Sequence, residues 1–139
     1  MQATESVHVL RVNVKPYTGA HSPNVFAVVD SGRAVLLDAG FPDNDSIDSR
    51  LDYLKAIGGP RVEMIIVTHH HFDHVGGANR LREATGARIA MHPEEERLLR
   101  QTLPRPPRDG GPQERYIRQE VAKITVDRPL ADGDVIRVG

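Results

Sequence analysis

Four histidines and one aspartate fall within six consecutive residues of this 139-residue chain. They are His69, His70, His71, Asp73 and His74, within the stretch IVTHHHFDHVGG. Imidazoles crowded in this way repel one another when protonated, and they lose hydration when buried without partners. A divalent cation removes both problems, because neutral imidazole and ionised carboxylate are its ordinary ligands. The cluster therefore predicts a metal site.

The spacing within the cluster divides its members between two ions. In extended backbone, residues i and i+2 point the same way, so we expect His69 and His71 to hold one ion while His70 points elsewhere. Asp73 and His74 follow at the bend into a helix, where we expect them to reach a second ion. Nitrogen and oxygen ligands without sulfur suit Zn²⁺ best, with Fe or Mn as alternatives.

The composition narrows the class of protein. The 18 basic and 19 acidic residues are spread along the chain, so no nucleic acid partner is expected. The absence of cysteine excludes disulfides, thiolate ligands and a cysteine nucleophile. No apolar run could span a bilayer and the start lacks the layout of a secretory signal, so we expect one soluble domain over residues 1–139, no membrane partner and a cytoplasmic location.

Strands and helices alternate before the cluster. The β-branched stretches 7–14 and 24–30 predict strands, and the second continues through SGR into AVLLD as a hairpin with Gly32 at its turn. A helix is expected from the spacing of Ile47, Leu51, Leu54 and Ile57, ending near residue 58. The apolar run 62–68 predicts a strand covered on both faces, and it leads directly into the histidines.

The same alternation continues after the cluster. Gly76 and Gly77 are expected to let the backbone turn sharply beside the metals, and a helix then runs to Gly86. We expect a strand over 87–92, a helix opened by Pro93, a surface loop or lid over 103–112 and a helix over 113–122. Residues 123–139 predict two strands around an Asp-Gly turn at 132–133. The remaining histidines, His8, His21 and His92, are interpreted as solvated or hydrogen-bonded surface groups.

Two stretches of the chain resemble a known family. THHHFDHVGG after an apolar strand resembles the signature of the metallo-β-lactamase superfamily, and NVFAVVDSGRAVLLDAG resembles the hairpin that precedes it there. The resemblance covers nearly the whole chain. It implies an α/β (α+β) fold, with a mixed sheet flanked by helices, which forms the N-terminal half of a four-layer αββα sandwich. The metals would lie at one edge between the two sheets of that sandwich.

The resemblance also implies roles for individual residues. His69 and His71 match the ligands of the first metal, and Asp73 and His74 match those of the second. Asp73 could also orient the nucleophile, which makes it the candidate catalytic residue. Asp38, which closes the LLDAG strand, matches a position that supports the ligand shell, and the alternative interpretation is an aspartate that caps a turn.

Such a site implies hydrolysis, because divalent metals lower the pKa of water and stabilise the oxyanion that forms on attack. The motif resembles glyoxalase-II-like thioester hydrolases and lactonases, so we expect a metal-dependent hydrolase of small-molecule esters, thioesters or lactones. One alternative is a non-catalytic binding or dimerisation module with the same fold. Another is a nucleic-acid-processing nuclease, which the near-neutral charge and the 4% aromatic content disfavour.

One departure from the family pattern concerns the later ligands. No histidine follows His92, whereas complete members supply a third histidine, a bridging aspartate and a final histidine further on. We therefore expect a domain truncated at mid-fold, with its C-terminal half absent. A catalytic zinc normally has three protein ligands, so this form should bind metal weakly and turn over poorly. Its uncovered apolar sheet face should favour a homodimer.

Overall fold

Six strands form one mixed sheet in the order β1-β2-β3-β4-β5-β6. The computed structural model describes residues 5–10, 24–105 and 112–139. The strands are β1 (Val7–Leu10), β2 (Val25–Asp30), β3 (Arg33–Leu37), β4 (Arg61–Val67), β5 (Arg88–Met91) and β6 (Arg128–Pro129). The helices are α1 (Asn44–Ala56), α2 (Phe72–Val75), α3 (Ala78–Thr85), α4 (Pro93–Thr102) and α5 (Pro112–Ala122).

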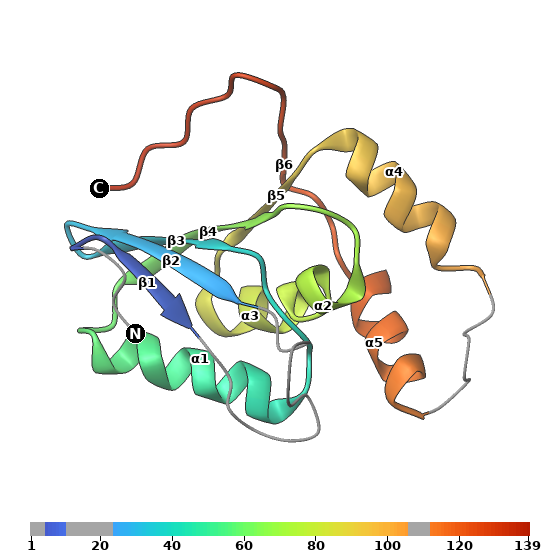
Figure 1. Cartoon of the computed structure of the whole chain (residues 1–139), viewed down its shortest axis with the longest axis horizontal. Coiled ribbons are helices and arrows are strands. Elements are labelled where there is room, and N and C mark those ends of the chain that lie inside the picture. Colours follow the sequence, from blue (N-terminus) through green and yellow to red (C-terminus); the bar gives the residue numbers. More distant parts are fainter. Residues whose placement is uncertain (1–4, 11–23, 106–111) are drawn as a thin grey trace.

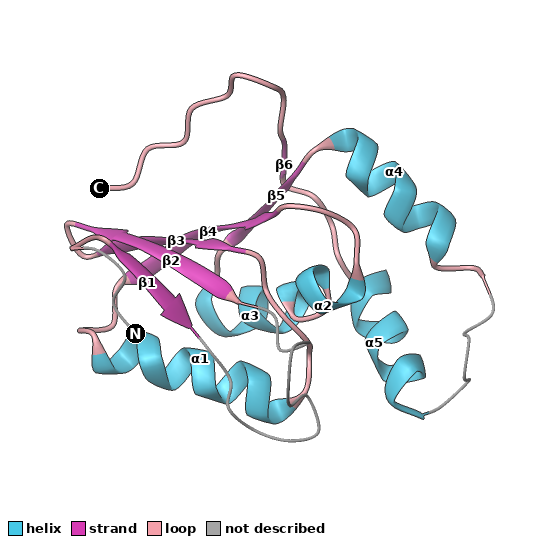
Figure 2. Cartoon of the chain, viewed as in Figure 1, coloured by secondary structure: helices cyan, strands magenta, loops and turns pink. Residues whose placement is uncertain are grey.

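The connections between strands explain the mixed character of the sheet. β1, β2 and β3 pair antiparallel, and the expected hairpin between β2 and β3 is confirmed. Its turn has left-handed backbone at Ser31 (φ 51°) and Gly32 (φ 75°), as two-residue hairpins require. From β3 onwards all pairs are parallel, because helices carry the chain back to the starting edge each time (Figure 2).

The main core lies between one face of the sheet and helices α1 and α3 (Figure 1). Ile65 and Val67 of β4 point into this core with Ile47 of α1 and Leu81 of α3, and all four are buried. Fully burying a side chain of this size contributes about 1.5–3 kcal/mol each. In the described part of the chain, no helix is long and apolar enough to cross a membrane.

The opposite face of the sheet carries a smaller apolar cluster. None of the described helices covers this face (Figure 1). Val35, Met64 and Ala90 form the cluster, and Ile136 and Val138 from the C-terminal segment lie against it. The expected strand pair over 123–139 is only partly correct. The turn at 131–134 forms, but the described residues after β6 join no strand.

The single histidines differ in their surroundings. His8 is buried rather than at the surface, and its Nδ1 lies 2.8 Å from the Tyr53 hydroxyl of α1. The reason is the pleat of β1, which turns His8 to the helix-covered face. His92 is exposed, as expected, and its Nδ1 accepts a hydrogen bond from the Glu94 backbone N–H (3.1 Å) as the N-cap of α4. His21 and residues 11–14 and 106–111 of the expected strand and loop lie outside the described residues.

Candidate metal centre

The histidine cluster lies at the edge of the sheet where the parallel strands β3 and β4 end. Asp38 follows β3, while Thr68 and His69 follow β4, and His74 lies on the short helix α2. Because β3 and β4 are parallel neighbours, their carboxyl ends meet at one edge. This is the edge at which open α/β sheets bind their ligands.

Asp38 is the centre of the hydrogen-bond network at this edge. Its backbone has a left-handed φ of 68°, which a non-glycine residue rarely adopts, and its N–H donates to the Ile66 carbonyl (2.7 Å). The carboxylate accepts hydrogen bonds from the Thr68 backbone N–H (2.8 Å) and hydroxyl (2.9 Å). Oδ2 of the carboxylate lies 2.9 Å from the Thr68 hydroxyl and 2.8 Å from Nδ1 of His74. Asp38 thus joins the ends of two strands to one histidine of the cluster.

Two glycines allow α2 and α3 to approach the loop after β3. The Ala39 N–H donates to the His74 carbonyl (2.8 Å), and the Gly77 N–H donates to the Gly40 carbonyl (2.7 Å). A Cβ on Gly77 would collide with the Ala39 carbonyl oxygen, and one on Gly76 would lie 2.5 Å from the Phe72 carbonyl oxygen. Both glycines have ordinary helical backbone angles. Close approach, rather than the sharp turn that we expected, is therefore the reason for the glycine pair.

Arg50 supports the same loop from inside the core. Only 1% of this residue is exposed, and its guanidinium donates to the Leu10 carbonyl and the Ser46 hydroxyl. It lies directly under Gly40, where a Cβ would overlap it. Burial lowers the pKa of Arg50 to about 10, against the opposing effect of Asp43, so Arg50 stays charged at neutral pH.

The structure brings the candidate ligands together to different degrees. The His69 ring centroid lies 4.1 Å from that of His74 and 4.9 Å from that of His71. Asp73 Oδ2 lies 3.6 Å from Nε2 of His74. One ligand atom each from Asp38, His69 and His74 lie within 4.8 Å of one another. His69, Asp73 and His74 are half-buried, whereas His71 is exposed.

The His70 ring centroid lies 4.9 Å from that of His71, and the hydrogen bonds of His70 lead to α4. Glu95 Oε2 accepts a hydrogen bond from its backbone N–H (3.0 Å) and lies 2.6 Å from its Nδ1. This contact orients the first turn of α4 relative to the cluster. Sequence reasoning missed Glu95, because it is one of three consecutive acids in that turn and nothing local distinguishes it. It also missed Thr68.

The electrostatics of the cluster suit a metal ion. The pKa of His69 is lowered by burial and by the neighbouring charges of His74 and His71, and Asp38 and Asp73 oppose this effect. A lowered pKa keeps the imidazole neutral, which is the form that binds metals. Imidazole nitrogens and carboxylate oxygens at this edge are a donor set that zinc accepts. The described residues therefore fit a divalent ion.

A hollow of about 520 Å³ adjoins the cluster on the side of α4 and α5. Its lining consists of His70, His71, Phe72, Thr102, Arg105, Glu114 and Arg118. Since His71 belongs both to the cluster and to this lining, a molecule in the hollow would contact the candidate metal ligands. Its size lies within the usual range for small-molecule pockets.

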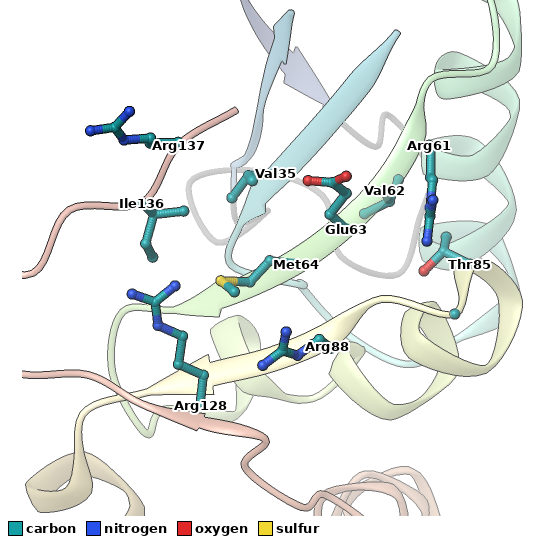
Figure 3. Close-up of a pocket in the computed structure, with 11 residues that line it drawn as sticks. Val35, Arg61, Val62, Glu63, Met64, Thr85, Arg88, Arg128, Ile136 and Arg137 are labelled. Atoms are coloured by element: carbon teal, nitrogen blue, oxygen red, sulfur yellow. The ribbon is translucent and has the colours of Figure 1, made fainter. Parts of the chain in front are cut away.

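A second hollow, of about 460 Å³, lies on the other face of the sheet. Figure 3 shows Arg61, Glu63, Arg88 and Arg128 around it. Arg61 and Arg88 begin β4 and β5, so this hollow is at the opposite end of the strands, about 20 Å from the cluster at 3.3 Å per residue. The described residues that line it include no histidine.

Known proteins resemble this chain in sequence. Acyl-coenzyme A thioesterase MBLAC2 of Gallus gallus is 31% identical over 144 residues, which cover 88% of this chain and 48% of that protein. Hydroxyacylglutathione hydrolase of Ectopseudomonas mendocina is 55% identical over 40 residues, which cover 29% of this chain and 16% of that protein. The chain thus spans at most about half the length of these relatives.

Solved structures share the fold. A β-lactamase domain protein from Burkholderia ambifaria superposes with a TM-score of 0.73 at 21% identity, over 100% of this chain and 44% of that one. A subclass B3 metallo-β-lactamase of Bradyrhizobium japonicum superposes with a TM-score of 0.70 at 21% identity, over 100% of this chain and 47% of that chain. The family model of the metallo-β-lactamase superfamily matches residues 18–139. The expected fold class is confirmed, and the chain belongs to the metallo-β-lactamase superfamily.

Proposed function

We propose that the chain provides the N-terminal part of a zinc-dependent hydrolase that cleaves thioester, ester or lactone bonds of small molecules. The observation that carries the proposal is the convergence of His69, His71, Asp73 and His74 at one sheet edge beside a pocket. Membership of the superfamily supports a metallo-hydrolase. The names of the relatives, a thioesterase and a hydroxyacylglutathione hydrolase, favour a thioester over other acyl compounds.

In this proposal each candidate residue has one role. His69 and His71 hold one ion, and Asp73 and His74 hold the other. Zinc supplies a Lewis acid and makes water acidic enough to act as a nucleophile at neutral pH. Asp73, half-buried on the first turn of α2, would also orient the nucleophile.

Asp38 positions His74 rather than binding metal itself. Both of its oxygens already accept hydrogen bonds, from Thr68 on one side and towards His74 Nδ1 on the other. A carboxylate on Nδ1 fixes the ring and its tautomer, which leaves Nε2 free to bind a metal. The short distances among Asp38, His69 and His74 are consistent with this supporting role.

We also propose that the chain alone binds zinc weakly and has low activity. Two imidazoles for one ion, and one imidazole and one carboxylate for the other, fall short of the three protein ligands of a typical catalytic zinc. Low affinity therefore follows from the number of ligands rather than from their placement.

The test combines metal binding with turnover. Zinc is titrated into the 139-residue chain by competition with a chromophoric chelator, and hydrolysis of a simple acyl thioester is followed with and without a strong chelator. We expect weak zinc binding and slow hydrolysis that the chelator abolishes. Stoichiometric, tight binding of two zinc ions would contradict the weak-binding proposal. Hydrolysis that persists after complete removal of metal would contradict a metallo-hydrolase.

A further inference from the structure

The pocket beside the histidine cluster is lined by charged side chains that have no role in the proposed function. Phe72 forms its apolar part, and the charged residues around it are Arg105, Glu114 and Arg118. The four residues come from α2, from the turn after α4 and from α5. The balance of charge among them determines which molecules the pocket accepts.

Arg118 has a structural role in the pocket wall. Its guanidinium donates to the carbonyls of Thr102 (3.3 Å) and Leu103 (2.8 Å), and to the Glu114 carboxylate (3.2 Å). Its Cζ also lies 5.3 Å from the centre of the Phe72 ring, in a cation–π contact. Arg118 thereby ties α5 to the end of α4 and to α2. The charges of Arg118 and Glu114 compensate each other.

Arg105 is the remaining charged group of the lining. Its backbone N–H donates to the Thr102 carbonyl (3.1 Å), which fixes the turn after α4 at the rim of the pocket. Its side chain is exposed and makes no hydrogen bond or ion pair with any residue that the structure describes. Among the described lining residues one positive charge is therefore left unbalanced, that of Arg105.

We propose that this pocket binds an oxyanion of the substrate, a carboxylate or a phosphate, and that Arg105 is the residue that selects it. This inference rests on the proposed hydrolase function. A guanidinium is suited to such groups because it offers paired N–H donors in a plane that matches carboxylate and phosphate oxygens. Phe72 and the volume of the pocket leave room for the adjoining apolar part of the same molecule. The preferred substrates are thus anionic thioesters rather than neutral ones.

The proposal can be tested without turnover. The probes are three non-hydrolysable thioethers with the same acyl-like end and a different second end: a carboxylate, a phosphate monoester or a neutral amide. Binding to the metal-free 139-residue chain is measured by calorimetry or by NMR shifts. In a complex with an anionic probe, Arg105 and the anion would form a solvent-exposed ion pair, and such pairs contribute little free energy. We therefore expect the anionic probes to bind about fivefold more tightly than the amide. High salt should reduce the difference.

Variants identify the residue responsible. Arg105→Ala should bring the anionic probes to the affinity of the amide, whereas Arg105→Lys, which keeps the charge without the planar pair of donors, should keep only part of the preference. Arg115→Ala is the matched control, because Arg115 is exposed on α5 but does not line the pocket. The proposal is wrong if all probes bind wild type equally, if Arg105→Ala keeps the preference, or if Arg115→Ala removes it equally. The carboxylate and phosphate probes show which oxyanion is preferred.

The two proposals fail in different ways. If neither anionic nor neutral thioesters are hydrolysed while the anionic thioethers still bind through Arg105, the hydrolase proposal fails and the oxyanion site stands. If thioesters are hydrolysed but Arg105→Ala leaves the ratio of kcat/KM for anionic and neutral substrates unchanged, the oxyanion site fails alone.

Discussion

Oδ2 of Asp38 lies 2.8 Å from Nδ1 of His74, although the two residues are 36 positions apart in the chain. The contact turns the other ring nitrogen of His74 towards Asp73, whose Oδ2 lies 3.6 Å away. Thr68 holds the Asp38 carboxylate from the opposite side. A buried carboxylate thus sets the orientation of one candidate ligand, and the predictions for metal binding begin with it.

Asp38→Asn should weaken zinc binding by about 10- to 100-fold, because the loss of a carboxylate partner of a metal-binding histidine typically has this effect. The fold should survive, since an amide oxygen can still accept the Thr68 N–H. Competition titration measures the affinity, and circular dichroism checks the fold. Asp48→Asn, on the exposed side of α1, is the control. An unchanged zinc affinity in a folded Asp38→Asn variant would show that Asp38 does not position His74.

The neighbouring histidines should respond differently to replacement. His69→Ala and His71→Ala remove proposed ligands and should lower zinc affinity at least about tenfold. His70→Ala removes the side-chain contact with Glu95 and the ring contact with His71, and it keeps the backbone hydrogen bond to Glu95. No proposed ligand is lost, so zinc affinity should change little while amide exchange in the first turn of α4 increases. Equal loss of zinc binding in His70→Ala and His69→Ala would contradict the assignment.

The contact between Glu95 and His70 should depend on pH. The hydrogen bond from His70 lowers the pKa of Glu95 below its ordinary value. A carboxyl group with a depressed folded pKa stabilises the fold above its unfolded pKa, about 4.3, and this stabilisation disappears as the pH falls through the folded pKa. The free energy of unfolding should therefore differ between wild type and Glu95→Gln at about pH 6, and the difference should shrink as the pH falls through the lowered pKa of Glu95.

Urea unfolding at several pH values measures this difference. Glu96→Gln is the control, because Glu96 lies on the same helix and only reaches Arg100 at 3.7 Å. A difference between wild type and Glu95→Gln that is constant over the whole pH range would mean that the carboxylate charge has no part in the contact.

Gly77→Ala should destabilise the protein by about 3 kcal/mol, because the added methyl group overlaps backbone atoms that cannot move independently. Gly86→Ala is an informative comparison. Its Cβ would meet nothing within 4 Å, so only its left-handed φ of 74° opposes the change, at about 1 kcal/mol. Urea unfolding compares the two. An equal loss of unfolding free energy in the two variants would contradict the close contact between Gly77 and the Ala39 carbonyl oxygen.

We propose that two copies of the chain associate through the sheet face that carries no helix. Its apolar cluster of Val35, Met64 and Ala90 is buried in one copy, with Ile136 and Val138 of the C-terminal segment against it, so association requires that segment to move aside. Association of two copies would bring together the positive charges around the second hollow, which belong to Arg61, Arg88, Arg128 and Arg137. Salt screens such repulsion, so sedimentation should show dimers whose association strengthens with ionic strength. Ile66→Lys, on the same face, should give monomers, and a wild type that stays monomeric at high concentration would refute the proposal.

Much of the fold could be predicted from the sequence, because its signals are local. The hairpin at Gly32 and the end of α3 at Gly86 follow from the backbone that these residues allow. The N-cap of α1 has an equally local cause, since the Asp43 carboxylate accepts a hydrogen bond from Ser46 N–H three residues on. The histidine cluster is also contiguous. Its chemistry could therefore be read without knowing what surrounds it.

Tertiary structure alone decided which residues meet that cluster. The parallel pairing of β3 and β4 brings Asp38 to His74, and the return of the chain through β5 brings Glu95 to His70. The same long-range packing buries His8 and places Arg105 in a pocket wall. These contacts depend on strand order and on the packing of helices from distant segments. No local pattern of residues encodes either of them.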